Sequence, residues 1–427
     1  MFKRLTGILC LIIICATASA AVSVRTENGS ALLSADGATI AEWGRYADIV
    51  PLGGDLFAAG DAGSYALMNA QGEGISAAGY GYLECADYAV IAEKDGKLGL
   101  LDKSGREISG FEYAAITEGE NGVYWALSGD SASALGMELC ILGSGVENKT
   151  GLRLLGIGNR PYNGLLSARL SDGHSGYIDA EGNMAIAAQF QHASDFVNGC
   201  AAVALDDKFG AIDTSGALII PAEYDFLQVS EYGYIIAAQM AGRVAVFDMH
   251  GALIDEYFGE NISIGLVGRH YTVCDEISLR VYSESHEMLF ETAPTASVSV
   301  GIGDQLIVSR GTFGENSTRI RGTERDYQNI VPLGVIDGEA VYASISVNAV
   351  KYEDNMLGEI QYALDMTGVR CGVIDSKGEK LLEDEYLSVE MLGEDRLLVQ
   401  TEYEWQMIDI SGKVYWSGDV KTQPSAE

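Results

Sequence analysis

The stretch that decides the fold is FVNGCAAVALDDKFGAIDTSGALIIPAEYDFLQV, residues 196–229. Its centre, residues 210–216, reads glycine, two apolar residues, Asp213, two polar residues and Gly216. An aspartate side chain can hydrogen-bond the backbone two residues on, and glycine accepts a positive φ. The D-x-x-G pattern therefore predicts the tight turn of a β-hairpin. Short apolar runs on both sides, such as residues 217–220, predict the two strands that the turn joins.

The same pattern recurs along the chain. It is clear at residues 99–105 (GLLDKSG) and 372–378 (GVIDSKG), and weaker copies lie near Ser34, Leu142, Ser283 and Asn316. The steps 69 to 102, 179 to 213, 213 to 248 and 375 to 409 measure 33, 34, 35 and 34 residues. A fixed period of this size indicates a repeat architecture. Asn69 takes the aspartate position once, and the predicted repeat turns are those of Asp102 and Gly105, Asp179 and Gly182, Asp213 and Gly216, Asp248 and Gly251, Asp375 and Gly378, and Asp409 and Gly412.

A second marker keeps the same register. An aromatic residue lies eleven positions after the turn residue in five copies: Tyr80, Tyr113, Phe190, Tyr224 and Tyr386. A recurring aromatic can be the residue that packs one repeat against the next, or it can line a surface for a carbohydrate or peptide. The burial of these side chains distinguishes the two.

Each repeat has room for four short strands, which form a small antiparallel sheet. Such a sheet cannot bury both faces alone, so its neighbours must stack on it. We expect an all-β fold, a β-propeller-like array of short antiparallel four-stranded blades, with an open β-solenoid stack of the same repeats as the alternative. The repeat domain spans about ten repeats over residues 21–416. The step of 59 residues from Asn316 to Asp375 predicts an irregular insertion near 319–367.

The stretch 196–248 resembles the WG repeat of bacterial proteins, in which an aromatic-Gly pair begins a strand, D-x-x-G follows and an aromatic-Asp lies beyond. Phe209 stands once in the position of the namesake tryptophan, where other copies have Leu98, Ser175 or Cys371. The copies are therefore degenerate. The resemblance implies an envelope or interaction role and supplies no catalytic residues.

The N-terminal residues predict export. Lys3 and Arg4 precede an apolar run over residues 5–15, and small residues end at Ala20, which is the pattern of a signal peptide over residues 1–20. That run is too short to span a bilayer, so we expect no membrane span and an extracytoplasmic protein, secreted or associated with the cell envelope. Residues 417–427 are expected to be a disordered tail.

A formal net charge of −34 excludes nucleic acid as a partner, because binding phosphates requires concentrated Lys and Arg. Cationic partners remain compatible with this charge. The five cysteines beyond residue 20 are scattered and the five histidines show no metal-binding spacing, so we predict no metal, no cofactor and no catalytic residues.

We therefore expect a non-enzymatic binding module for a protein or glycan that the sequence does not identify. A polysaccharide-active hydrolase or lyase and a structural spacer without a ligand are the alternatives. The stretches that depart from the period, 117–133, 143–164 and 311–367, are the predicted binding loops.

Overall fold

The computed structural model describes residues 21–26, 29–34, 36–61, 63–143, 146–311, 317–354, 359–392 and 395–419. The predicted signal peptide, residues 1–20, lies outside them, as does most of the predicted tail. The described residues form β-strands and two short 3-10 helices, η1 (Glu120–Gly122) and η2 (Ile302–Asp304). No helix among them has the length and apolarity needed to cross a membrane.

The first half of the chain forms two three-stranded sheets followed by one of ten strands. The three-stranded sheets are β1 (Ala21–Thr26), β2 (Gly29–Ser34) and β3 (Thr39–Tyr46), then β4 (Asp48–Gly53), β5 (Leu56–Asp61) and β6 (Ser64–Asn69). The ten-stranded sheet consists of β7 (Tyr82–Cys85), β8 (Val90–Lys94), β9 (Lys97–Leu101), β10 (Tyr113–Glu118), β11 (Val123–Ser128), β12 (Met137–Gly143), β13 (Val146–Ile157), β14 (Leu166–Leu170), β15 (Ser175–Ile178) and β16 (Met184–Phe190).

The second half forms six separate sheets, all with consecutive strands paired antiparallel. The first three are β17 (His192–Ala193), β18 (Cys200–Leu205), β19 (Lys208–Asp213) and β20 (Leu218–Tyr224); β21 (Phe226–Val229), β22 (Tyr234–Gln239), β23 (Arg243–Asp248) and β24 (Leu253–Phe258); and β25 (Ser263–Val267), β26 (His270–Cys274), β27 (Leu279–Tyr282) and β28 (Met288–Thr292). The last three are β29 (Ser297–Val300), β30 (Leu306–Arg310) and β31 (Ser317–Ile320); β32 (Asn329–Ile336), β33 (Glu339–Asp354), β34 (Glu359–Asp375) and β35 (Lys380–Tyr386); and β36 (Ser388–Met391), β37 (Leu397–Gln400), β38 (Glu404–Ile408) and β39 (Val414–Asp419).

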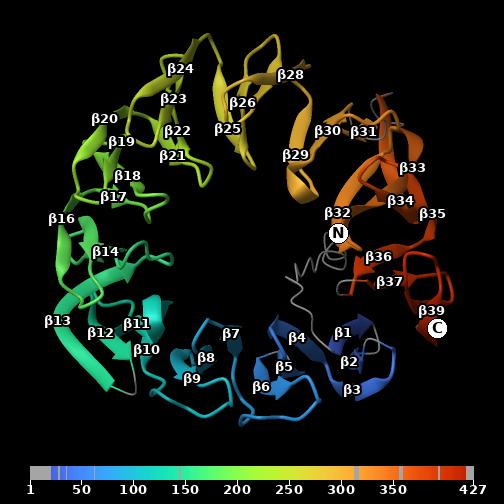
Figure 1. Cartoon of the computed structure of the whole chain (residues 1–427), viewed down its shortest axis with the longest axis horizontal. Helices are drawn as coiled ribbons and strands as arrows, with labels where there is room; N and C mark the ends of the chain where they lie inside the picture. Colours follow the sequence, from blue (N-terminus) through green and yellow to red (C-terminus); the bar gives the residue numbers. More distant parts are fainter. Residues whose placement is uncertain are drawn as a thin grey trace.

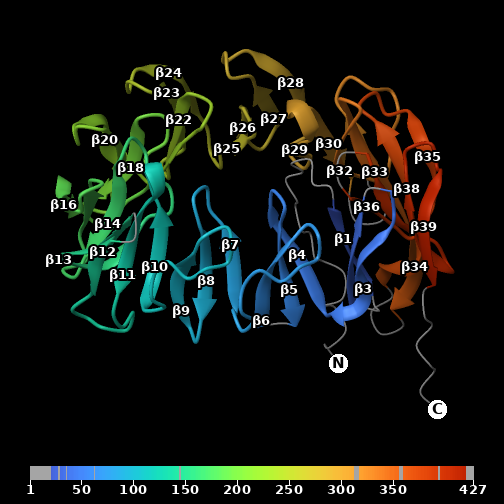
Figure 2. The same ribbon diagram turned by 60° about the horizontal axis from the view of Figure 1, so that its bottom comes forward.

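The sheets follow one another around a ring, with the first strand of each on the inner side and the last on the outer side (Figure 1). Viewed from the side, strands such as β5, β8 and β11 run from one face of the ring to the other (Figure 2). The ten-stranded sheet holds three repeats and the other eight sheets hold one each, so the ring has eleven modules. The propeller-like array is thus the observed fold.

Apolar side chains between neighbouring modules hold the ring together. Between the modules β17–β20 and β21–β24, Ile220 and Tyr224 pack against Ile235, Ala245 and Phe247, all of them buried. The two middle strands of a module are buried on both faces, and each fully buried Val, Leu or Ile contributes about 1.5–3 kcal/mol. Ten clusters of this kind join neighbouring modules.

One of these clusters closes the ring. It joins the N-terminal module to the C-terminal one through Val24 and Leu33 on one side and Leu398 and Met407 on the other. At its edge Trp43 stacks on Trp416 with 5.1 Å between ring centroids. Among the described residues, no strand of the N-terminal sheet pairs with the C-terminal sheet, so packing rather than strand pairing makes this junction.

The number of strands per module differs from the expected four at several places. In the module β4–β6 the fourth strand is reduced to two isolated bridges, Tyr65 with Tyr80 and Met68 with Gly74. Here the hydroxyl of Ser76 accepts the hydrogen bond of the Leu67 N–H at 2.8 Å, and Ser109 does the same for Leu100 in the module β7–β9. Serine hydroxyls thus replace backbone acceptors of the sheet.

The expected insertion near 319–367 takes the form of long strands. β33 and β34 have 16 and 17 residues, whereas the equivalent strands β22 and β23 have six each. Their pairing continues out to Asp354 and Glu359. At the C-terminus, β39 extends to Asp419, so the first residues of the predicted tail belong to a strand.

The glycines of the repeat turns also contact the preceding module. Gly251 has a φ of +81°, and a Cβ built on it would lie 2.1 Å from the carbonyl oxygen of Ile219. Ile219 belongs to β20, the last strand of the module before. This position therefore needs glycine for its backbone conformation and for the close approach of two modules.

We predict that Gly251→Ala lowers the free energy of unfolding more than Gly233→Ala does. Gly233 also has a positive φ, +93°, but its Cβ would meet no atom within 4 Å. Gly233→Ala should cost about 1–2 kcal/mol for the backbone conformation alone. Gly251→Ala should cost about 1–3 kcal/mol more because of the clash with Ile219. Urea denaturation of both variants tests this, and equal losses would contradict a close contact between modules at Gly251.

Candidate functional site

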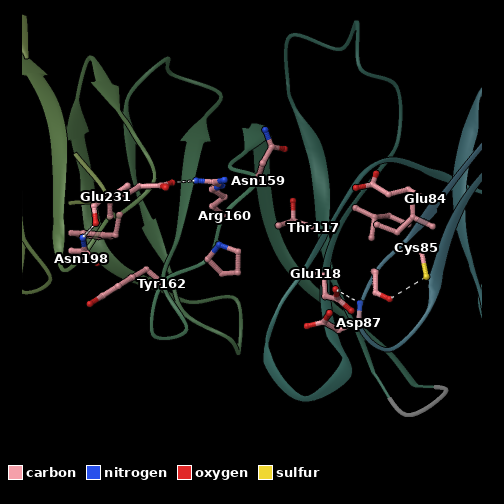
Figure 3. Close-up of a pocket in the computed structure, with 16 residues that line it drawn as sticks. Glu84, Cys85, Asp87, Thr117, Glu118, Asn159, Arg160, Tyr162, Asn198 and Glu231 are labelled. Carbon is pink, nitrogen blue, oxygen red and sulfur yellow. Dashed lines mark hydrogen bonds and ion pairs between the residues drawn. The ribbon is translucent and has the colours of Figure 1, made fainter. Parts of the chain in front are cut away.

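A groove of about 860 Å³ lies where the connections between first and second strands of successive modules meet (Figure 3). These connections follow β7, β10, β13, β17 and β21, and in an up-and-down sheet they all emerge on the same face of the ring. Five modules thus contribute to one groove. Its lining consists of Glu84, Cys85, Ala86, Asp87, Ile91, Ile116, Thr117, Glu118, Asn159, Arg160, Pro161, Tyr162, Phe196, Val197, Asn198 and Glu231.

Asp195 fixes the loop that follows β13. Its Oδ2 accepts hydrogen bonds from the backbone N–H groups of Asn159 and Arg160, both at 3.0 Å, and its Oδ1 accepts one from the Ser167 hydroxyl at 2.6 Å. A Cβ on Gly158 would lie within 1.9 Å of Asp195 Oδ1, so this approach requires a glycine there. The carboxylate of one module therefore holds the loop of the module before it.

Glu118 does the same two junctions earlier. Its carboxylate accepts hydrogen bonds from the backbone N–H groups of Asp87 at 2.7 Å and Tyr88 at 3.1 Å, and from the Tyr124 hydroxyl at 2.8 Å. Burial, followed by this bond to Glu118, raises the pKa of Tyr124. Glu118 and Asp195 both lie sixteen residues beyond their turn aspartates, Asp102 and Asp179.

The exposed charges of the groove are mostly acidic. Glu84, Asp87 and Glu231 are exposed, and Arg160 is the one basic residue among the described lining. Arg160 forms an ion pair with Glu231 at 2.5 Å across two modules, with 72% and 60% of the two side chains exposed. Figure 3 shows this pair bridging the groove. Exposed pairs of this kind contribute at most about 1 kcal/mol, so a ligand can displace it.

Aromatic side chains form part of the floor and the edge. Phe196 is buried against Tyr177, with ring centroids 4.5 Å apart, and tilts toward Tyr162 at 6.4 Å. Tyr88 and Tyr232, next to the lining residues Asp87 and Glu231, are 56% and 42% exposed. The groove thus offers apolar contact area beside carboxylates.

The predicted turn residues lie away from this groove, in the turns between third and fourth strands. In each turn the glycine N–H donates to the aspartate carbonyl at 2.9–3.1 Å: Gly105 to Asp102, Gly182 to Asp179, Gly216 to Asp213, Gly251 to Asp248, Gly378 to Asp375 and Gly412 to Asp409. The aspartate Oδ1 accepts the N–H four residues on, as Asp375 does from Glu379 at 2.8 Å. These carboxylates therefore bind their own backbone.

The five repeated aromatics are all buried, with exposures of 1% to 8%: Tyr80, Tyr113, Phe190, Tyr224 and Tyr386. Each belongs to an apolar cluster between modules. Tyr224, for example, packs edge to face on Phe247 at 5.8 Å. Their side chains are therefore not available to a ligand in this structure.

Among the described residues, no group of three or more His, Cys, Asp or Glu is placed to hold a metal ion. The five cysteines beyond residue 20 are free thiols, and burial raises the pKa of Cys140 to about 12 and of Cys200 to about 11. Cys85, which lines the groove, has the ammonium of Lys103 at 2.7 Å from its sulfur.

The sequence matches one family model, and the structure is weakly similar to solved structures. The family model described as WG containing repeat matches residues 176–209 and 209–240. Residues 176–240 thus contain two WG repeats. The two matched WG repeats contain β18 and β19 and supply Phe196, Asn198 and Glu231 to the groove. No protein with a curated description matches the sequence.

Solved structures share only low identity with this chain. BamB from Moraxella catarrhalis is 13% identical, with 61% of this chain and 92% of that one covered, and a TM-score of 0.34. A eukaryotic initiation factor is 11% identical, with 66% and 82% covered and a TM-score of 0.37. The WD40 β-propeller domain of Doa1 is 16% identical, with 52% and 86% covered and a TM-score of 0.24. Structural similarities this weak carry no argument about the fold, which is defined by the sheets of this chain itself.

The sequence predicted only part of the groove. The predicted binding stretches 117–133 and 143–164 contain Thr117, Glu118 and the loop 159–162, whereas 84–87, 196–198 and Glu231 were missed. A signal for the site existed in the repeat itself. The position of Glu118 and Asp195 is Cys85, Gly158 or Val229 in other copies, so an acidic residue there departs from the pattern.

We predict that the stabilisation by a turn aspartate disappears in acid. Hydrogen bonds from Ser411, Lys413 and Tyr415 hold the pKa of Asp409 at about 2, below its ordinary value of 3.8. A carboxylate whose pKa is lower in the folded than in the unfolded state stabilises the fold at pH values above its unfolded pKa. For Asp409 this stabilisation is lost as the pH falls from about 4 to about 2. Asp409→Ala should therefore cost about 1 kcal/mol at pH 7 and progressively less in acid.

Urea denaturation at pH 7, 4 and 3 measures this difference. Glu260→Ala, a change of an exposed loop carboxylate, serves as the control and should change stability little at any pH. A loss for Asp409→Ala that stays constant down to pH 3 would contradict the assignment.

Proposed function

We propose that this protein is an exported, non-enzymatic binding module that holds a basic peptide segment of a partner protein in the groove described above. The observation that carries the proposal is the groove itself, which five successive modules line and whose exposed carboxylates, Glu84, Asp87 and Glu231, have a single arginine among them. A bacterial cell envelope or its surroundings would be the place of action. A glycan ligand, a polysaccharide-active enzyme and a spacer are the alternatives.

The charge of the groove favours a cationic ligand. Glu84, Asp87 and Glu231 are exposed and lie in a chain of net charge −34, so the local potential attracts Lys and Arg side chains. A ligand arginine can displace Arg160 from Glu231. Exposed Tyr88 and Tyr232 can then contact its guanidinium face.

The geometry of the groove favours binding without reorganisation. Glu84, Glu118 and Arg160 stand on or next to strands of the ten-stranded sheet, whose hydrogen bonding is continuous from β7 to β16. The carboxylates of Glu118 and Asp195 hold the loops at the groove through paired backbone N–H groups. A groove built in this way is preorganised, which lowers the entropy cost of binding.

The roles of the groove carboxylates also support binding more than catalysis. Glu118 accepts hydrogen bonds from backbone N–H groups and from a tyrosine hydroxyl, which leaves it positioned as a structural acceptor. Glu84 accepts a hydrogen bond from the Tyr82 hydroxyl at 2.8 Å. General acid–base catalysis needs unlike groups that converge on one reacting atom, and these carboxylates are spread along the groove.

We predict that a lysine-rich peptide binds the groove. The probe is a fluorescein-labelled twelve-residue peptide of alternating lysine and serine, and fluorescence anisotropy at low and at physiological salt measures its affinity. The triple variant Glu84→Gln, Asp87→Asn and Glu231→Gln should weaken binding about tenfold or more, because it removes three of the charges that attract the peptide. Affinity should fall as salt increases.

The control variant carries the same change of charge elsewhere: Glu112→Gln, Glu181→Gln and Glu260→Gln, all exposed and outside the groove lining. It should change the affinity less than twofold. If it weakens binding as much as the groove variant, attraction is due to net charge alone and the site is wrong. Absence of peptide binding, or binding of neutral oligosaccharides instead, would also overturn the proposal.

We predict that the exported chain begins at Ala21. Cleavage after Ala20 leaves β1 intact, because this strand starts at Ala21, which is 3% exposed in the core of the N-terminal module. Mass spectrometry of the protein secreted by a host with a general export pathway gives the mature N-terminus. A chain that stays in the cytoplasm with residues 1–20 attached would refute export.

A further inference from the structure

One junction of the ring differs from all the others. Ten junctions contain a buried apolar cluster, whereas no such cluster among the described residues joins the module β25–β28 to the module β29–β31. Polar contacts cross it. Arg269 pairs with Asp304 at 2.6 Å, and the Arg310 Nε donates to the Thr292 hydroxyl at 3.1 Å.

Three arginines face this junction from one side of a sheet. Val308 pairs with Arg319, and Arg310 pairs with Ser317, so these four side chains share one face of β30 and β31. Arg321 follows two residues after Arg319, on the same face. Its guanidinium lies 5.1 Å from the centre of the Phe290 ring and donates to the Leu289 carbonyl at 2.9 Å. Phe290 and Leu289 belong to β28 of the neighbouring module.

A cavity of about 260 Å³ lies between the two modules at this point. We call it the arginine slot, and it is lined by Phe290, Glu291, Val308, Arg310, Ser317, Arg319, Arg321, Gly322, Thr323 and Asp326. Its volume is several times the share of one liquid water, about 30 Å³. It can therefore hold an ionised group together with a small organic body.

The charges in the slot leave two guanidiniums without a carboxylate. Arg319 forms two hydrogen bonds of 2.6 Å with Asp326, and this contact holds the pKa of Asp326 below its ordinary value. Among the described residues, Arg310 and Arg321 form no ion pair within 4 Å, and their partners named above are neutral. A guanidinium has five N–H donors, so each keeps donors that can reach a ligand.

We propose that the arginine slot binds one small organic oxyanion, a phosphate, sulfate or carboxylate, whose charged group lies against Arg310 while its body extends along the slot toward Arg321. The planar guanidinium fork matches the oxygens of such groups. The net charge of −34 and the carboxylates of Glu291 and Asp326 repel a polyanion, which would extend beyond the slot. A small anion is held at short range, where the two arginines dominate.

The test is isothermal titration calorimetry of the chain from residue 21 onward with three probes, sodium phosphate, sodium sulfate and sodium glucuronate, at equal ionic strength. At least one probe should bind with a stoichiometry of one. Tight phosphate binding points to a phosphate ester and tight glucuronate binding to a sugar acid. The variant Arg310→Gln with Arg321→Gln should weaken binding at least tenfold, as expected for the loss of charge-assisted hydrogen bonds.

Two further variants keep the test decisive. Arg325→Gln removes one positive charge from a residue that pairs with Glu379 at 3.1 Å and does not line the slot, and it should change the affinity less than twofold. Arg310→Lys keeps the positive charge but loses the planar guanidinium group. It should leave the protein folded and weaken ligand binding several-fold. No binding of any probe, or an equal loss in Arg325→Gln, would overturn the proposal. The slot and the groove lie in different parts of the ring, so failure of one leaves the other intact (Figure 1).

Discussion

Apolar packing between small sheets is the interaction on which this structure depends. A sheet of three or four short strands has two faces and cannot cover either of them itself. The middle strands show the result, since Ile235, Ile236 and Ala237 of one strand are all completely buried although they alternate between the two faces. Each module is therefore stable only with a neighbour on both sides. A chain of such modules ends with two uncovered faces unless it closes, and the cluster of Val24, Leu33, Leu398 and Met407 covers both.

The sequence predicted the repeat because its markers are local. The D-x-x-G turn depends on a carboxylate bonding its own backbone, and the aromatic eleven residues later depends on the facing module, so both recur with the period. The strand count could not be read in the same way. Ser76 and Ser109 replace backbone acceptors in the sheet, and β13 serves as a partner to β12 and to β14, which links modules into one sheet. Such details depend on neighbours that no single repeat reveals.

The groove was harder to predict than the fold for a physical reason. Its residues are loop positions from five modules, separated by up to about four periods in sequence and brought together only by the curvature of the ring. Asp195 and Glu118 could be noticed as departures from the repeat, but their partners, the N–H groups of residues 159–160 and 87–88, carry no side-chain signature. The continuous ten-stranded sheet below gives these loops a common support. Much of the groove is thus a property of one rigid part of the ring.

The junction between the modules β25–β28 and β29–β31 shows how charged side chains alter the packing of two sheets. Arg310 and Arg321 are exposed and 43% of the Arg319 side chain is exposed, so their guanidiniums remain in contact with solvent, where a charge costs far less than in an apolar core. Arg319 obtains a carboxylate, Asp326, while among the described residues Arg310 and Arg321 reach a hydroxyl and a carbonyl of the preceding module. The remaining donors need water or an anion, so the two sheets stay apart and a cavity persists between them. The slot is therefore a consequence of the charges that line it, and replacing Arg310 and Arg321 by apolar residues would be expected to close it into an eleventh apolar core.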